Sequence, residues 1–235
     1  MSERLYSATC FPPVETALRE PNGLLAMGGD LSIERLLDAY RHGIFPWFNP
    51  GEPILWWSPD PRMVLVPGEI RVTRSLAKRI RNAGFDVRVD TAFAEVMRGC
   101  GAPRRVEPGE AAAGTWISPM MVAAYSRLFD AGYAHSVETW HKGELVGGLY
   151  GVAIGRMFYG ESMFSREPDA SKVALVRLAR QLQQWEFGLI DCQMETSHLA
   201  SMGARPIPRA AFTARLAELV KLPHRPGPWR FDAPD

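Results

Sequence analysis

The sequence predicts an α+β fold, in which a small amino-terminal domain precedes a larger domain built on a mixed, mostly antiparallel sheet. Residues 135–164 alternate through two glycine-containing turns, a pattern typical of a β-meander. An amphipathic stretch at 169–188 leads directly into the short apolar run LIDCQ, which indicates a helix followed by a strand. The start of the chain is instead rich in Pro, Gly and Trp, so we expect two domains, 1–65 and 66–235.

One helix is well marked in the smaller domain. Ser32 is a good amino-terminal cap and Gly43 a carboxyl-terminal stop. Between them lies one apolar stripe, formed by Ile33, Leu36, Leu37 and Tyr40. Residues 44–65 contain a run of Pro and Trp residues, so we expect an irregular, aromatic-packed segment there rather than a regular element.

The larger domain contains further predicted helices around the meander and the LIDCQ strand. They are expected at 71–84, 91–101, 118–132, 169–188, 196–203 and 208–222, with one more strand at 85–90. Thr91 is the expected cap of the second helix and Ser118, followed by Pro119, of the third. The long helix at 169–188 is expected to begin at a Ser171 or Asp169 cap.

The composition excludes several classes of protein. Hydrophobic residues make up 46% and charged residues 23% of the 235 residues, as in an ordinary globular protein, and a net charge of +1 provides no global field toward nucleic acid. Residues 1–13 have no apolar core of signal-peptide length, and no stretch is long enough to span a bilayer. An odd number of cysteines, at positions 10, 100 and 192, suggests reduced thiols. We therefore expect a cytoplasmic protein with no membrane partner.

The run LIDCQ places reactive side chains at the end of a strand. Because side chains alternate between the two faces, Asp191 and Gln193 point one way and Cys192 the other. We therefore interpret Cys192 as a small buried hydrophobe, not as a nucleophile paired with His198. The chain has no Cys-x-x-Cys pair, so we expect no metal site.

Two carboxylates are candidates for acid–base or cation-binding roles. Asp191, at a strand end beside an amide, could serve as a general base or could close a turn. Glu161 lies among aromatic residues and shares a strand face with Met163, so it could bind a cation in the wall of a pocket. The alternative for Glu161 is an ion pair with Arg166 or Arg156.

Other features bear on larger ligands. The loop SREPDASK before the long helix contains no Gly, so it lacks the close backbone approach that holds the pyrophosphate of coenzyme A. One side of the helix at 71–84 carries basic residues, which suits either a phosphate backbone or plain exposure to solvent: Arg74, Lys78 and Arg81. The aromatic residues that could stack on a base, or else lie in the core, are Trp47, Phe48, Trp56, Trp57 and Trp116.

Motifs along the whole chain resemble those of one known family. They run in order from about residue 11 to residue 215: REPNGLLAMGGDLS, GIFPWF, ILWWSPDPR, GTWIS, HSVETW, LVGGLYGV, GESMFSR, the ASK motif and LIDCQ. Together they resemble the leucyl/phenylalanyl-tRNA–protein transferases. The element order of the larger domain is similar to that of the N-acetyltransferases, and the family resemblance likewise implies an acetyltransferase-like (GNAT-like) domain.

The resemblance implies a bacterial cytosolic aminoacyltransferase. Such an enzyme moves Leu or Phe, and less well Met, from aminoacyl-tRNA to the N-terminal Arg or Lys of an acceptor protein, which marks that protein for degradation through the N-degron pathway. The aminoacyl ester is already activated, so no ATP, metal or other cofactor is expected. The remaining hypotheses are a coenzyme A-dependent N-acyltransferase and a non-catalytic tRNA-binding module. We expect a monomer, because the net charge is near neutral and heptads are absent.

The resemblance also implies roles for individual residues. Asp191, aligned with Gln193, would accept a proton from the acceptor's α-ammonium group or only position the amine, and Glu161 would hold the substrate amino group or the cationic acceptor. The apolar pocket for the donor side chain would be formed by Leu149, Phe158, Met163, Leu175 and Ile190. Of these, Ile190 is expected on the strand face opposite Asp191. The tRNA contacts would be Trp47 and Trp116 at the terminal adenosine and Arg74, Lys78 and Arg81 at the acceptor stem.

Overall fold

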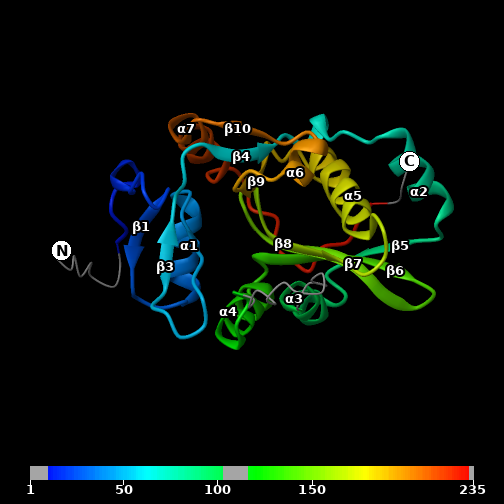
Figure 1. Ribbon diagram of the computed structural model, residues 1–235, viewed down its shortest axis with the longest axis horizontal. Helices are drawn as coiled ribbons and strands as arrows, with labels where there is room; N and C mark the ends of the chain where they lie inside the picture. Colours follow the sequence, from blue (N-terminus) through cyan, green and yellow to red (C-terminus); the bar gives the residue numbers. More distant parts are fainter. Residues whose placement is uncertain (1–9, 103–115, 233–235) are drawn as a thin grey trace, which may run out of the picture.

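A computed structural model describes residues 10–102 and 116–232 (Figure 1). The strands form a three-stranded sheet in the order β1-β3-β2 and a seven-stranded sheet in the order β10-β4-β9-β8-β7-β6-β5. Residues 1–9, which we assessed for a signal sequence, lie outside the described residues, as do the first two residues of the GTWIS motif. Within the described ranges, no helix is both long and apolar enough to cross a membrane.

The smaller sheet lies near the amino-terminal end of the molecule. It consists of β1 (Leu24–Met27), β2 (Phe45–Pro46) and β3 (Leu55–Trp57), all antiparallel, after a short 3-10 helix η1 (Val14–Thr16). Helix α1 (Ile33–Arg41) forms where the apolar stripe predicts it. The hydroxyl of Ser32 accepts a hydrogen bond from the backbone N–H of Arg35 and so caps the helix.

The segment 44–65 is more regular than we expected. It contains β2, β3 and also β4 (Arg62–Leu65), a fully buried strand of the seven-stranded sheet. The interpretation of this segment as irregular is therefore wrong. Strands of two to four residues separated by Pro-containing turns are too short to show alternation. Strand β4 ends at residue 65, so the larger sheet begins on the amino-terminal side of the expected domain boundary.

The larger sheet confirms the predicted mixed, mostly antiparallel arrangement. Strands β5 (Asp86–Val89), β6 (Ala134–His141), β7 (Glu144–Ile154) and β8 (Met157–Ser165) pair antiparallel in sequence order. Strand β9 (Leu189–Gln193) then lies parallel to β8. On the far side of β9, β4 and β10 (Arg205–Ile207) complete the sheet with antiparallel pairs. The parallel β8–β9 pair is the position at which the candidate site forms.

Helices cover both faces of this sheet. Their bounds are α2 (Arg74–Asn82), α3 (Phe93–Gly101), α4 (Pro119–Asp130), α5 (Ala170–Gln184), α6 (Ser197–Ser201) and α7 (Arg209–Leu219), with the 3-10 helix η2 (Pro67–Glu69) after β4. Helices α3 and α4 pack into one hydrophobic core together with α1 and α7. Helix α5 lies on the opposite face and contributes to a second core (Figure 1). One face of β8 and β9 therefore packs against the core of α3 and α4, and the other face packs against the core of α5.

Helices α3 and α5 lack the side-chain caps that we expected. Helix α3 begins after Ala92, and the hydroxyl of Thr91 donates to the carboxylate of Glu138 on β6 instead of capping the helix. That buried carboxylate accepts from the backbone N–H groups of Thr91 and Ala92. It thereby caps the helix in place of Thr91, and its position is favourable because the amino terminus of a helix attracts negative charge. At α5, Asp169 occupies the cap position without a side-chain cap bond, and the hydroxyl of Ser165 accepts from the N–H of Ser171.

Candidate active site

Two β-bulges on adjacent strands build the candidate site. On β9, Val64 of β4 pairs with Asp191 and Met63 with Gln193, so Cys192 is an extra residue. Gln193 itself has a left-handed backbone (φ 61°), and its N–H donates to Asp191 Oδ1 over 2.9 Å. On β8, the pairing with β7 shifts between Ser162 and Gly160, so Glu161 is likewise an extra residue. Bulges redirect side chains, and here they bring the side chains of Gln193 and Glu161 together.

Asp191 is held in a buried ion pair that the sequence reasoning missed. The guanidinium of Arg62 on β4 donates from Nε to Oδ1 over 2.8 Å and from NH2 to Oδ2 over 2.7 Å, and both side chains are 1% exposed. Arg62 also donates to the carbonyl of Gly43 and lies over the rings of Phe45 and Phe212. A bidentate Arg–carboxylate pair is strong and geometrically fixed, so both oxygens of Asp191 are committed to Arg62.

A signal for Arg62 exists in the sequence. Carboxylates are seldom buried without a partner, so a buried Asp191 calls for a cation in an apolar setting. Arg62 directly precedes the apolar run Met63-Val64-Leu65, where a charged residue would otherwise be out of place. Only the location of β4 beside β9 identifies it among the arginines of the chain.

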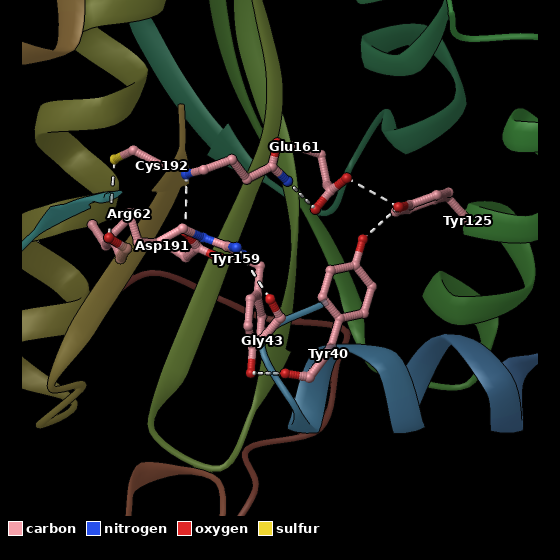
Figure 2. A network of polar contacts seen from close by, with 10 residues as sticks. Tyr40, Gly43, Arg62, Tyr125, Tyr159, Glu161, Asp191 and Cys192 are labelled. Carbon is pink, nitrogen blue, oxygen red and sulfur yellow. Dashed lines mark hydrogen bonds and ion pairs between the residues drawn. The ribbon is translucent and has the colours of Figure 1, made fainter. Parts of the chain in front are cut away.

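Glu161 lies at the centre of a chain of hydrogen bonds (Figure 2). Its Oε1 accepts from Gln193 Nε2 over 3.0 Å and its Oε2 from the hydroxyl of Tyr125 over 2.9 Å. Glu161 is 8% exposed, and burial raises the pKa of its carboxyl group to about 7, with a smaller contribution from the charge of Asp191. A carboxyl group with such a pKa can exchange a proton near neutral pH.

The ion pair that was the alternative for Glu161 does not form within the described part of the chain. Arg166 donates to the carbonyl of Leu145, and Arg156 lies over the ring of Phe187. The expected shared face of Glu161 and Met163 is also wrong. The bulge at Glu161 shifts the alternation, so Met163 packs into the α5 core while Glu161 faces Tyr125 in the other.

Tyrosines extend the network from Glu161 into the smaller domain. The hydroxyl of Tyr125 on α4 is hydrogen-bonded to that of Tyr40 on α1, and Tyr159 on β8 donates to the backbone carbonyl of Tyr40 over 2.8 Å (Figure 2). Burial raises the pKa of each of these phenols well above its usual value. They therefore stay protonated, and Tyr125 acts as a donor to Glu161. The sequence identified Tyr40 only as part of an apolar stripe.

Cys192 lies on the other side of β9 from the carboxylate of Asp191, as the alternation predicts. It packs at the edge of the α5 core, whereas Leu189, two residues before Asp191, lies in the core beneath α3 and α4. Burial raises the pKa of the Cys192 thiol well above its ordinary value, which disfavours the nucleophilic thiolate. No hydrogen bond between Cys192 and His198 is formed in the structure of residues 116–232.

The candidates for the donor pocket gather on the α5 face of the sheet. They belong to one hydrophobic core: Leu149, Phe158, Leu175 and Ile190 are buried, and Met163 is partly buried at its edge. Phe158 pairs with Ile190 across the parallel β8–β9 ladder, next to the pair formed by Tyr159 and Asp191. The apolar cluster and the polar network therefore lie on opposite faces of the same two strands.

Two family models match the chain. The model described as "Leucyl/phenylalanyl-tRNA protein transferase" matches residues 64–217, and the model of the N-terminal domain of the same family matches residues 29–60. This chain belongs to the leucyl/phenylalanyl-tRNA protein transferase family. The family member from Thiobacillus denitrificans is 81% identical over 99% of this chain and 100% of the relative. The member from Nitrosomonas europaea is 64% identical over 99% of this chain and 96% of the relative.

Solved structures of other families are more distant from this transferase family member. A GCN5-related N-acetyltransferase from Kribbella flavida matches with a TM-score of 0.37 and 13% identity, over 71% of this chain and 58% of that chain. The structure of L-PGS from Bacillus licheniformis matches with a TM-score of 0.40 and 12% identity, over 72% of this chain and 55% of that chain.

Among the described residues, none of the predicted tRNA-binding residues of this family member is hydrogen-bonded to Glu161. Trp47 is 41% exposed and packs edge-to-face on Trp57, while Trp116 is half-buried just before α4. The described residues show no ring contact between Trp47 and Trp116. Their joint role at an adenosine stays a prediction.

The basic stripe of α2 faces solvent. Leu76 is the buried residue of this helix, and Arg79 anchors it through an ion pair with Glu167 and a position over the ring of Phe85. The stripe residues Arg74, Lys78 and Arg81 are exposed, and none forms an ion pair within residues 10–102 and 116–232. Within the same ranges, no group of three or more His, Cys, Asp or Glu side chains could hold a metal ion.

Proposed function

We propose that this chain transfers Leu or Phe, and less well Met, from aminoacyl-tRNA to the N-terminal Arg or Lys of an acceptor protein. Membership of the transferase family supports the reaction class. The observation that carries the proposal is a buried Glu161 with a pKa of about 7, hydrogen-bonded by Gln193 at the end of β9. We further propose that the protein works as a cytoplasmic monomer and marks its acceptors for degradation through the N-degron pathway.

The reaction requires removal of one proton and positioning of one amine. The acceptor's α-ammonium group loses a proton, the free amine attacks the ester carbonyl, and a new N–C bond forms. The C–O bond to the tRNA ribose then breaks, and that oxygen leaves as a hydroxyl after taking up a proton. The ester is already activated, so positioning of the two reactants can supply much of the rate increase.

Glu161 takes the proton-accepting role in this proposal. Its pKa of about 7 lies near the operating pH, where general bases are most effective. Asp191 keeps both oxygens on Arg62 and accepts from the N–H of Gln193, so it positions Gln193. Gln193, held by Glu161, orients the amine toward the ester.

The donor would lie beyond the Tyr159–Asp191 pair, where β8 and β9 no longer pair, so that its ester faces the Glu161 network and its side chain the opposite face. The donor side chain would enter the α5-face core around Phe158, Leu149, Leu175, Ile190 and Met163. The terminal adenosine of the tRNA would contact Trp47 and Trp116. The exposed stripe Arg74, Lys78 and Arg81 would contact acceptor-stem phosphates, since it has no competing acidic partner among the described residues.

One assay tests the reaction class against the alternatives. The protein is mixed with labelled Leu-tRNA and a protein that bears an N-terminal Arg, without ATP or coenzyme A. We expect label in the acceptor protein, and none when the acceptor's α-amino group is acetylated. Binding of tRNA without transfer of label would instead indicate a tRNA-binding module. Transfer only after addition of an acyl-coenzyme A would indicate an N-acyltransferase.

A further inference from the structure

The carboxyl-terminal residues 223–232, which we name the strap, fold back over the sheet although they lie beyond the segment matched by the transferase model. The N–H of Gly227 donates to the carbonyl of Gly132, at the start of the meander. At the other end of the strap, Asp232 Oδ2 accepts from Gln181 Nε2 and from the indole N–H of Trp185. The strap is thus fixed to the turn after α4 at Gly227 and to α5 and Trp185 at Asp232.

Trp229 is the residue by which the strap enters that core. Its side chain is 3% exposed, and its backbone N–H donates to Asp90 Oδ2 over 2.6 Å. The indole stacks on the imidazole of His135, with 3.5 Å between ring centroids. Its other aromatic neighbours, at centroid distances of 5.1, 5.8 and 6.1 Å, are Trp185, Phe187 and Phe158.

The contact with Phe158 links the strap to the candidate donor pocket. The ring of Phe158 lies against the backbone of Gly151 on β7, so closely that a Cβ atom at this Gly would be 2.5 Å from the Phe158 Cζ atom. Phe158 is 1% exposed and the other pocket candidates are also packed, so a donor side chain can enter only if the ring shifts. The backbone limits the ring on the Gly151 side, and the indole of Trp229 is a further neighbour of the ring, tilted by 38° to it.

We propose that Trp229 of the strap is a specificity-determining residue that sets how far Phe158 can withdraw, and thereby the depth of the donor side-chain pocket. It acts through Phe158 and is therefore a positioning residue. The inference rests on the proposed function, because it takes Phe158 as part of the donor pocket. A deeper pocket favours the larger Phe side chain over Leu, and size discrimination in apolar pockets is modest and easily altered by the wall.

The test is a competition between two donors in one tube. Phe-tRNA and Leu-tRNA carrying different labels compete for the full-length protein, and the ratio of the two products is measured. Both donors use the same active fraction of enzyme, so partial unfolding lowers both products without changing their ratio. For Trp229→Ala we expect the Phe:Leu ratio to rise by about tenfold, the low end of the range of about 10- to 200-fold that one methylene produces in an apolar pocket, because Trp229 acts only through Phe158.

The matched control comes from the same strap. Phe231 lies over Arg177 and contacts Trp185 at 6.5 Å, and none of its ring contacts in the described residues is with Phe158. Phe231→Ala also removes a strap aromatic, and we expect it to leave the ratio at the wild-type value. If Trp229→Ala does not fold, Trp229→Leu provides the same test with a smaller cavity.

Phe158→Leu separates the two ways in which the inference can fail. A ratio unchanged by the Trp229 variants but altered by Phe158→Leu would overturn the role of the strap and leave the pocket in place. A ratio unchanged by all of these substitutions would overturn both this inference and the assignment of the donor pocket. An equal change of the Phe:Leu ratio in Phe231→Ala would also contradict the inference. Loosening the strap at any position would then be enough to change the ratio, without a specific role for Trp229.

Discussion

Two buried acidic clusters occupy the same seven-stranded sheet, and they differ in what holds their carboxylates. In the cluster at the β5 edge, backbone N–H groups hold both carboxylates, those of Ser136 and Trp229 for Asp90 and those of Thr91 and Ala92 for Glu138. The hydroxyls of Thr91 and Ser136 also donate to Glu138, and the imidazole of His135 is hydrogen-bonded to Asp90. Unlike side chains, the backbone donors cannot rotate away. This edge cluster joins β5, β6, α3 and the strap into one unit.

In the site cluster, Glu161 accepts from side chains instead. The amide of Gln193 and the hydroxyl of Tyr125 are its donors, and both can rotate or exchange a proton. Burial raises the pKa of Glu138 as it raises that of Glu161, so a shifted pKa does not by itself distinguish the two. The difference lies in the partners: a carboxylate fixed by backbone supports the fold, and one held by side chains can take part in a reaction.

The largest expected effect is the loss of transfer when Glu161, in the site cluster, is replaced. Glu161→Gln keeps the size of the side chain but removes the proton acceptor, so we expect transfer to fall by about 10²- to 10⁴-fold, the range for loss of a general base. Turnover is measured with saturating Leu-tRNA and an N-terminal Arg acceptor. Turnover within threefold of wild type would exclude Glu161 as the base.

Glu138→Gln is the matched control in the edge cluster. Its new NH₂ group would face N–H donors in place of a carboxylate oxygen, so we expect the free energy of unfolding to fall by about 1–3 kcal/mol, the cost of an unsatisfied buried group. Turnover per folded molecule should remain at the wild-type level. A large loss of turnover without loss of stability would remove the distinction between the clusters.

The next effect concerns stability in the site cluster. Arg62→Met leaves Asp191 buried without its cation, and removal of one partner of a buried ion pair costs about 3–5 kcal/mol. Urea unfolding measures the loss. The double variant Arg62→Met, Asp191→Leu should recover most of the stability, because no uncompensated charge remains. A double variant as unstable as the single one would show that packing around Arg62, not the ion pair, supports the fold.

Local sequence patterns were sufficient to predict the elements of this fold that depend only on residues close together in the sequence. Helices α1 and α4 begin at Ser32 and Ser118, where cap, apolar stripe and stop agree. Strand β9 puts Asp191 and Cys192 on opposite faces, because alternation is a property of the strand itself. These predictions needed no knowledge of what packs against the element.

The sequence could not show features that depend on residues far along the chain. Arg62 reaches Asp191 across 129 positions, and Glu138 takes over the α3 cap from 47 positions beyond Thr91. The bulge at Glu161 appears only when β8 is aligned with β7, and it moves Met163 to the other core. Pairing partners decide each of these features, and periodicity within one segment carries no information about them.

The smallest expected effect is a shift in the pH dependence of the transfer rate, which again distinguishes Glu161 from Glu138. If the carboxylate form of Glu161 accepts the proton, the logarithm of the transfer rate rises with pH and changes slope near pH 7, the folded-state pKa. Tyr125 donates to that carboxyl group and lowers its pKa, so Tyr125→Phe should move the change of slope to higher pH.

Stability depends on pH in the opposite direction: a rise in pH increases the transfer rate but removes the contribution of Glu161 to the free energy of unfolding. The pKa of Glu161 is higher in the folded protein than in the unfolded chain, so its contribution to stability is present below about pH 4.5 and is lost as pH rises through 7. The rate profile is measured between pH 5 and 8 with subsaturating Leu-tRNA, and Glu138→Gln should retain the wild-type change of slope. A Tyr125→Phe profile superimposable on the wild type would mean that this phenol does not control the proton on Glu161.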